Sequence, residues 1–162
     1  CIIVDAANTL SGIKFDEEEI IYGSGTCKDV VERIINTCNT KKLDNTPDEY
    51  VCMIIGLNAL YQKMTPIEKG NLTMAIQSSN ALGTVRFVMV EAIDQIKSIS
   101  YEAWYKANID LSQGIWIGNG IANQFTLKVT TNARVLRAEI DPKFGYVIKK
   151  GKATLIKFIS NE

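Results

Sequence analysis

Apolar residues along the chain fall into short continuous runs separated by amphipathic segments. Four runs predict strands, at residues 1–6, 19–22, 50–55 and 84–90. The run at residues 50–55 carries β-forming side chains on both faces, which is typical of a central strand in a parallel sheet. Helical segments separate the later runs, so the pattern predicts an α/β fold with a mostly parallel sheet, flanking helices and right-handed crossovers.

Two of the helices have recognisable start signals. Residues 26–29 form a variant of the capping box, and six apolar side chains after it share one helical face: Cys27, Val30, Val31, Ile34, Ile35 and Cys38. Thr65 as N-cap, Pro66 in the first turn and Glu68 three residues after the cap predict a second helix. We expect it to reach about Ala81, where Gly83 ends it.

The last third of the chain predicts shorter elements. In order these are a helix, two strands, a helix and a hairpin, at residues 100–107, 114–118, 124–130, 133–138, and 144–149 with 153–159. We expect the hairpin to turn at Lys150 and Gly151 and to extend one edge of the sheet. Its lysines could contact phosphates, or they could be solvated side chains that protect an edge strand: Lys149, Lys150, Lys152 and Lys157.

Length and composition predict one compact domain spanning residues 1–162, with 46% hydrophobic residues to form its core. The 18 basic and 18 acidic residues balance, so no nucleic-acid partner is expected. No apolar stretch approaches the roughly 20 residues that a membrane-spanning helix needs. The chain opens at Cys1 inside an apolar run and without a signal peptide, which suggests an N-terminally incomplete domain.

Metal and thiol chemistry are not expected. The four cysteines form no C-x-x-C pair and the chain has no histidine, which favours free and mostly buried thiols in a reducing cytosol and no metal site. Asp16, Glu17, Glu18 and Glu19 could bind cations, but consecutive carboxylates before a strand are more typical of a solvated loop. The glycines at residues 23–25 suggest either a phosphate cradle or an ordinary turn before a helix.

Two signatures of nucleotide hydrolysis are missing. The chain contains no G-x-x-x-x-G-K-[ST] loop to hold a triphosphate. The strand at residues 50–55 ends at Gly56 and Leu57. In a nucleotide-hydrolysing α/β domain, the end of such a strand usually carries one acid for Mg²⁺ and one for the attacking water. Unaided ATP hydrolysis by this chain is therefore not expected.

Read in order, the elements resemble an FtsK/SpoIIIE-type ATPase module without its first strand and helix. Its strand ending in an aspartate and a small residue is similar to the run that ends at Asp5 and Ala6. The acid-bearing strand corresponds to the one that ends at Gly56, and the sensor strand to the one before Glu91. Residues 114–125 and 144–152 further resemble the last ATPase module of EssC-type coupling proteins of type VIIb secretion.

The resemblance implies a P-loop NTPase fold of the FtsK/RecA type that lacks its phosphate-loop segment. It also implies a membrane-anchored motor on the cytoplasmic side of the bacterial cell membrane. The implied partners are secreted helical-hairpin proteins, neighbouring ATPase modules of the same chain and further subunits in a hexamer. Binding of ATP with Mg²⁺ by the intact module stays open, because it depends on the upstream phosphate-loop segment, and no cofactor is expected for this fragment.

The resemblance also suggests site residues. Glu91 would be sensor-like, and Gly145, Tyr146 and Lys150 would form an adenine-side wall, although turn geometry explains the same glycines without a ligand. Four aromatic residues could form a protein-docking pocket or could simply pack in the core: Tyr101, Trp104, Tyr105 and Trp116.

Two functions remain in competition at this point. The first is a catalytically degenerate ATPase-like module for substrate recognition and coupling in secretion. The alternative is a nucleotide-binding ATPase module of a DNA or protein translocase, active only with its upstream phosphate loop and neighbouring subunits.

Overall fold

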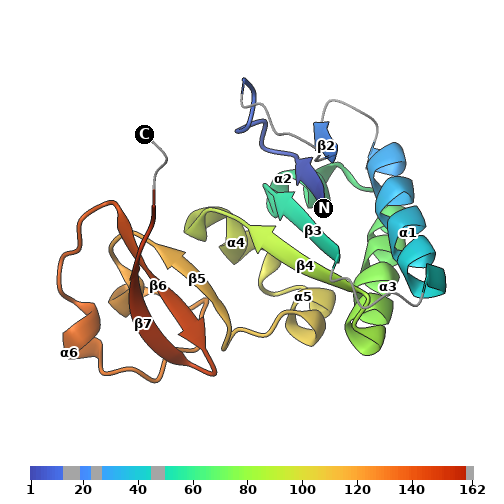
Figure 1. Ribbon diagram of the computed structural model, residues 1–162. Helices are drawn as coiled ribbons and strands as arrows, with labels where there is room; N and C mark the ends of the chain where they lie inside the picture. The colour runs from blue at the N-terminus through green and yellow to red at the C-terminus, as the bar shows by residue number, and fades with distance from the viewer. Residues whose placement is uncertain (13–18, 23–26, 45–49, 160–162) are drawn as a thin grey trace. The chain divides into compact units, whose positions relative to one another are not determined.

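The computed structural model of the chain describes residues 1–12, 19–22, 27–44 and 50–159 (Figure 1). Contacts between residues divide the chain into two compact units, Cys1–Asn108 and Ile109–Glu162, and each contains its own sheet. That residues 1–162 act as a single module stays a prediction.

The first unit is built on a parallel sheet of four strands in the order β2-β1-β3-β4. The strands are β1 (Ile2–Asp5), β2 (Glu19–Tyr22), β3 (Tyr50–Ile55) and β4 (Val85–Val90). All four were predicted from their apolar runs, and β3 takes the predicted central position between β1 and β4. The α/β class with a mostly parallel sheet is confirmed.

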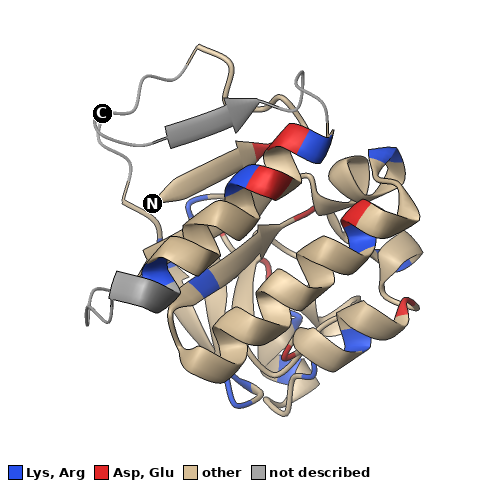
Figure 2. Cartoon of the chain, turned by 90° about the vertical axis from the view of Figure 1, so that its right-hand side faces the viewer, with Lys and Arg blue, Asp and Glu red and all other residues tan. Residues whose placement is uncertain are grey.

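Two long helices cover one face of this sheet, α1 (Cys27–Asp44) and α3 (Pro66–Leu82), and they run side by side in Figure 2. Helix α3 has the predicted capping box, because Thr65 Oγ1 accepts from the Glu68 amide and Glu68 accepts from the Thr65 amide. It ends where Gly83 takes a left-handed conformation, with φ of 67°. The capping sequence predicted before α1 includes Thr26, which lies outside the described residues.

Three short helices follow strands β3 and β4: α2 (Leu57–Lys63), α4 (Ile93–Ile99) and α5 (Ala103–Asn108). Only α5 was predicted, at residues 100–107. The N-caps of α2 and α4 are Gly56 and Ala92, which offer no side-chain hydrogen bond, so the usual start signal is absent. Among the described residues, no helix is both long and apolar enough to cross a membrane.

The core of the first unit lies between the sheet and these helices. Its fully buried side chains include Ile2, Val4, Ile34, Ile54, Leu57, Leu60, Ile76 and Ile99. The cysteines are free, as predicted, but only Cys38 and Cys52 are buried, whereas Cys1 is exposed. Burial raises the pKa of Cys52 to about 12, so this thiol stays neutral and acts as a small apolar core residue.

The second unit is a three-stranded antiparallel sheet of β5 (Gly114–Ile117), β6 (Phe144–Lys149) and β7 (Lys152–Lys157). The hairpin of β6 and β7 was predicted, and its turn residues Lys150 and Gly151 both have positive φ, 51° and 78°. The expectation that the hairpin extends the parallel sheet is wrong, because β6 pairs with β5 instead. The three strands complete a sheet of their own.

Residues 124–130 do not form the predicted strand. The Gln124 side chain binds both backbone groups of Leu127, which holds the segment in a turn, and the Lys128 amide donates to the carbonyl of Leu111. The short helices η1 (Ile121–Asn123) and α6 (Ala133–Leu136) follow the first strand of this unit. Together with the sheet they enclose a small core of Ile121, Leu136, Tyr146 and Ile148.

Candidate functional site

The carboxyl ends of β1, β3 and β4 lie in register at one edge of the parallel sheet, where ligands bind in open α/β folds. Asp5 pairs with Ile55, and Ile55 pairs with Val90. Beyond the strands, the Ala6 amide donates to the Ile55 carbonyl and the Gly56 amide donates to the Val90 carbonyl, each at 2.9 Å. The edge therefore brings together Asp5, Gly56 and Glu91, three positions singled out in the sequence.

Gly56 occupies a position that no other residue fits without strain. Its φ of 76° is left-handed, and a Cβ atom there would lie 2.7 Å from Ala7 Cβ and 2.8 Å from the Ala7 amide nitrogen. The next residue, Leu57, is fully buried at the start of α2. A carboxylate at Gly56 would clash with Ala7, and one at Leu57 would need burial in the apolar core.

The Glu91 carboxylate stabilises the amino end of helix α2. Its Oε2 accepts a hydrogen bond from the Asn58 amide in the first turn of α2 at 2.8 Å, and its Oε1 accepts one from the Ala92 amide at 2.8 Å. A carboxylate at the amino end of a helix also interacts favourably with the helix dipole. Gly56 cannot cap α2 with a side chain, and Glu91 from the next strand supplies that cap.

A polar network continues from this cap along the surface. Asn58 donates through Nδ2 to Gln95 Oε1 at 2.8 Å, and Asn58 Oδ1 accepts from Ser98 Oγ at 2.8 Å. These bonds connect α2 to α4. The sequence gave no signal for them, because the partners lie 37 and 40 residues apart and belong to two helices that lack capping residues.

Asp5 is a fully buried carboxylate that fixes the turn after β1. Its Oδ1 accepts from the amide and the hydroxyl of Thr9 at 3.0 and 3.2 Å, and its Oδ2 accepts from the Leu10 amide at 2.7 Å. Burial alone raises the pKa of Asp5, but these hydrogen bonds outweigh it and leave that pKa below the ordinary value of 3.8. Asp5 is thus ionised at neutral pH.

Two of the four predicted docking aromatics pack together in the first unit. The ring of Trp104 lies 5.4 Å from Tyr61 and 5.8 Å from Tyr105, measured between centroids. Lys69 Nζ lies 4.0 Å from the centre of the Tyr61 ring on α2. Tyr105 is buried, so this stack ties α5 and α2 to α3 as a core element.

The other two aromatics have different surroundings. Tyr101 is 79% exposed, with Lys106 Nζ 5.7 Å from its ring centre. Trp116 belongs to the second unit, where it packs against the core and donates through Nε1 to the Asn119 carbonyl at 3.0 Å. Of the predicted set, Tyr101 presents the largest free aromatic surface.

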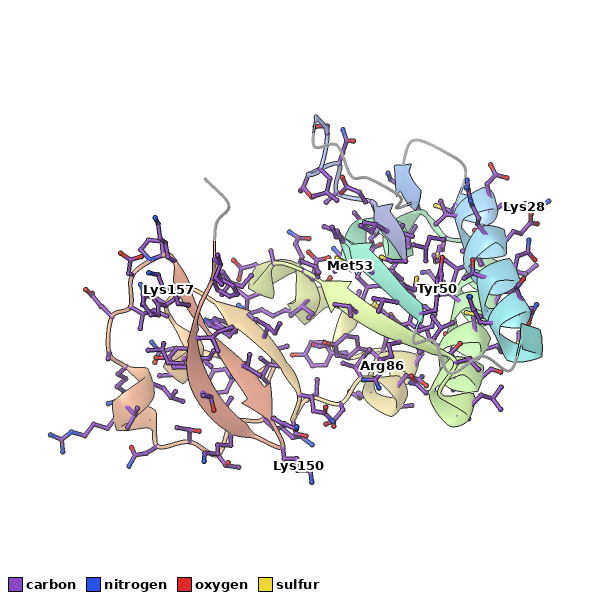
Figure 3. The ribbon with its side chains drawn as sticks, viewed as in Figure 1. Lys28, Tyr50, Met53, Arg86, Lys150 and Lys157 are labelled. Carbon is purple, nitrogen blue, oxygen red and sulfur yellow. The ribbon has the colours of Figure 1, made fainter. Side chains whose placement is uncertain are left out.

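The predicted adenine-side residues all lie in the second unit. A Cβ atom on Gly145 would meet the Trp116 carbonyl on β5 and, at 2.8 Å, the ring of Phe158 just after β7, so this close packing explains the glycine. Tyr146 is buried in the core. Lys150 lies at the exposed tip of the hairpin (Figure 3). A nucleotide-binding role for these residues stays a prediction.

Cation and phosphate sites suggested by sequence fall mainly outside the described residues. This holds for the acidic run that starts at Asp16 and for the glycines at residues 23–25. Within the part of the chain that the structure describes, no three acidic or thiol side chains come close enough to hold a metal ion.

The chain was compared with known proteins. Neither a protein-family model nor a curated protein sequence matches it. A solved structure titled "The cytoplasmic domain of EssC" matches with a TM-score of 0.62 and 15% sequence identity. The match covers 97% of this chain and 32% of that chain, so this chain spans about a third of that structure's length. At this identity the similarity concerns the fold: the chain is folded like part of the cytoplasmic domain of EssC.

Proposed function

We propose that this chain is a catalytically degenerate ATPase-like module of a type VII secretion motor, acting in substrate recognition and coupling rather than in ATP hydrolysis. The observation that carries the proposal is the geometry at the end of β3. Gly56 has left-handed φ and lies against Ala7, and Leu57 is buried, so neither position suits a catalytic acid. The similarity in fold to the cytoplasmic domain of EssC supports the link to secretion.

Under this proposal the module works on the cytoplasmic side of the bacterial cell membrane within a larger protein. Its partners are secreted helical-hairpin proteins, adjacent ATPase modules of the same chain and further subunits in a hexamer. Of the four predicted docking aromatics, Tyr101 is the one best placed to meet cargo, because it is 79% exposed and lies beside Lys106. Under this proposal, binding of ATP and Mg²⁺ would require a module that includes a phosphate loop, which this chain does not contain.

Calorimetric titration of the 162-residue chain with a purified helical-hairpin cargo protein tests the proposal. We expect saturable binding without nucleotide, weakened at least about tenfold by Tyr101→Ala, as for an exposed aromatic anchor. Phe125→Ala is the matched control, because Phe125 is also an exposed aromatic side chain, at 99%, and its loss should not affect binding. No heat with cargo, or equal losses in both variants, would contradict the proposal.

A second candidate function is a nucleotide-binding ATPase module that needs an upstream phosphate loop and neighbouring subunits. The observation in its favour is that Asp5, Asn58 and Glu91 gather at the carboxyl edge of the sheet. Hydrolysis of Mg-ATP by the chain extended at its amino end, with that hydrolysis lost in Glu91→Gln, would favour this alternative. Nucleotide-independent cargo binding and no hydrolysis would favour the first.

A further inference from the structure

Lysines gather at the tip of the hairpin formed by β6 and β7. Lys149 ends β6, Lys150 lies in the turn and Lys152 begins β7, and all three side chains are exposed. Lys157 belongs to the same stretch of sequence, but it pairs with Phe144 at the opposite end of the hairpin (Figure 3). The fold therefore places three of these four lysines together and one apart.

A further lysine joins the hairpin tip from a neighbouring loop. The Thr130 amide donates to the Gly151 carbonyl at 2.8 Å, so this loop lies against the turn. A Cβ atom placed on Gly151 would lie 3.2 Å from the Lys128 carbonyl oxygen, and the Lys128 side chain is exposed. We call this group of four side chains the basic tip: Lys128, Lys149, Lys150 and Lys152.

The charge of the basic tip has a local cost. Lys149 and Lys152 lie directly opposite each other in the ladder, where like charges destabilise a hairpin. Lys150 has a φ of 51°, a left-handed conformation for which hairpin turns favour asparagine, aspartate or glycine. One acid, Asp110, attracts Lys128, which leaves the tip with an excess of positive charge. Positions that depart from local rules in this way are typical of functional surfaces.

Protection of an edge strand does not account for the basic tip. Charged side chains guard a sheet when they lie on its outermost strands. The sheet has the order β5-β6-β7, so Lys149 lies on the central strand, while Lys128 and Lys150 lie outside the strands. Only Lys152 is on an edge strand. The other three lysines need a different explanation.

An exposed phenylalanine lies at the same end of the antiparallel sheet. Phe125 is 99% exposed, and hydrogen bonds between the Gln124 side chain and Leu127 hold the turn that carries it. A Cβ atom on Gly114 would lie 3.4 Å from the Leu127 side chain, and Gly114 pairs with Ile148, which directly precedes the basic tip. An apolar ring and a group of lysines therefore share one end of the second unit.

We propose that this end of the second unit binds the surface of an anionic lipid membrane, with the basic tip on the lipid phosphates and the Phe125 ring in the apolar boundary below them. Lysines are attracted by the diffuse negative charge of such a surface, and an exposed ring adds apolar area that the bilayer buries. Recognition of phosphopeptides or nucleic acids uses arginine forks or several stacked aromatics, whereas the basic tip has no arginine and a single aromatic neighbour.

Co-sedimentation of the 162-residue chain with phospholipid vesicles tests the proposal. We expect binding to vesicles of equal parts phosphatidylcholine and phosphatidylglycerol, and none to vesicles of phosphatidylcholine alone. Combining Lys149→Gln, Lys150→Gln and Lys152→Gln should weaken the binding at least about tenfold, because three charges near the lipid surface are lost. High salt should weaken the binding of the wild-type chain as well, since it screens these charges.

A matched control removes the same charge from exposed positions of the first unit. Combining Lys28→Gln, Lys63→Gln and Lys97→Gln should weaken vesicle binding by no more than about twofold, because these lysines are not part of the basic tip. Equal losses in the two triple variants would overturn the proposal, because overall charge and not the basic tip would then drive binding. Circular dichroism checks that both variants fold.

The role of the ring has its own test. Phe125→Ala should weaken binding to the anionic vesicles at least about threefold, because less apolar area is buried. An unchanged affinity would contradict insertion of the ring into the membrane.

Other outcomes would assign the basic tip to a different ligand or to none. A wild-type chain that does not sediment with anionic vesicles would overturn the proposal. So would binding of a single-stranded oligonucleotide or of inorganic phosphate that is lost in the Lys149, Lys150 and Lys152 variant, if vesicles are not bound. The vesicles are tested without cargo and without nucleotide, so failure here leaves the proposed function untouched.

Discussion

At the scale of single residues, Gly56 is the position on which the most depends. Two separate features require glycine there: the left-handed φ of 76° and the close approach of Ala7. Gly83 shares only the first feature, because its φ is 67° but nothing lies within 4 Å of a Cβ placed on it. The two glycines therefore allow backbone strain and steric exclusion to be measured apart.

We predict that Gly56→Ala lowers the free energy of unfolding by about 3 kcal/mol, from backbone strain and displacement of Ala7 together. Gly83→Ala should cost only about 1 kcal/mol, from the left-handed backbone alone. Urea denaturation followed by circular dichroism measures both values. Equal losses would show that Ala7 moves aside easily and that an acid at Gly56 is sterically tolerable.

The buried carboxylate of Asp5 predicts a pH dependence. Its pKa in the folded chain lies below 3.8, so the folded state prefers the ionised form more than the unfolded state does. The stabilisation is therefore complete well above pH 3.8 and is lost as the pH falls through the folded pKa. Stability curves for wild type and Asp5→Asn should differ by about 1–2 kcal/mol at pH 7 and should converge in acid. Curves that stay parallel down to acid pH would contradict the assignment.

At the scale of secondary structure, the strands of the parallel sheet were predictable from the sequence, whereas the short helices α2 and α4 were not. Continuous apolar runs such as residues 50–55 identify a buried strand from local sequence, and α3 has a complete capping box at Thr65. By contrast, the start of α2 is specified by Glu91, which lies 33 residues from its partner Asn58. A cap that arrives from another strand leaves no mark near the helix that it stabilises.

The wrong strand in the second unit has a local cause instead. Residues 124–130 contain β-forming side chains, but the Gln124 side chain occupies both backbone groups of Leu127, so these groups are not available for a strand ladder. The end of β3 carries glycine and leucine in place of the acids expected of a hydrolase, and a degenerate site there stays a prediction. The contact between Gly56 and Ala7 joins two turns distant in sequence, so only the structure shows it.

The contribution of the Glu91 cap on α2 to stability can be tested by mutation. Glu91→Ala should lower the free energy of unfolding by about 1 kcal/mol, because the Asn58 amide loses its acceptor and the helix dipole loses a nearby negative charge. Asp94→Ala is the control, since Asp94 is exposed and makes a surface ion pair with Lys97, and its loss should change stability by no more than about 0.5 kcal/mol. Thermal and urea unfolding measure both variants. A neutral Glu91→Ala would leave Glu91 free for a sensor role.

At the scale of the whole molecule, the chain has two sheets. A parallel sheet forms one core with the helices packed on it, and a small antiparallel sheet has a core of its own. The cores share no residues: the first is centred on Ile2, Ile54 and Ile76, and the second on Tyr146 and Ile148. Because cooperativity in proteins follows packed cores, the division predicts that the two units lose structure separately. The outcome also decides whether residues 1–162 behave as one module.

Tyr146→Ala tests this independence, because Tyr146 is a large buried side chain of the second core and its removal should cost about 3–4 kcal/mol there. We expect native-state hydrogen exchange to lose protection in β5, β6 and β7, while amides of β1, β3 and β4 keep theirs. Leu155→Ala, at a side chain 48% exposed on β7, should leave both sets nearly unchanged. If protection falls equally in both sheets with Tyr146→Ala, the units unfold together, and the hairpin is then an integral part of one cooperative module, as predicted from the sequence.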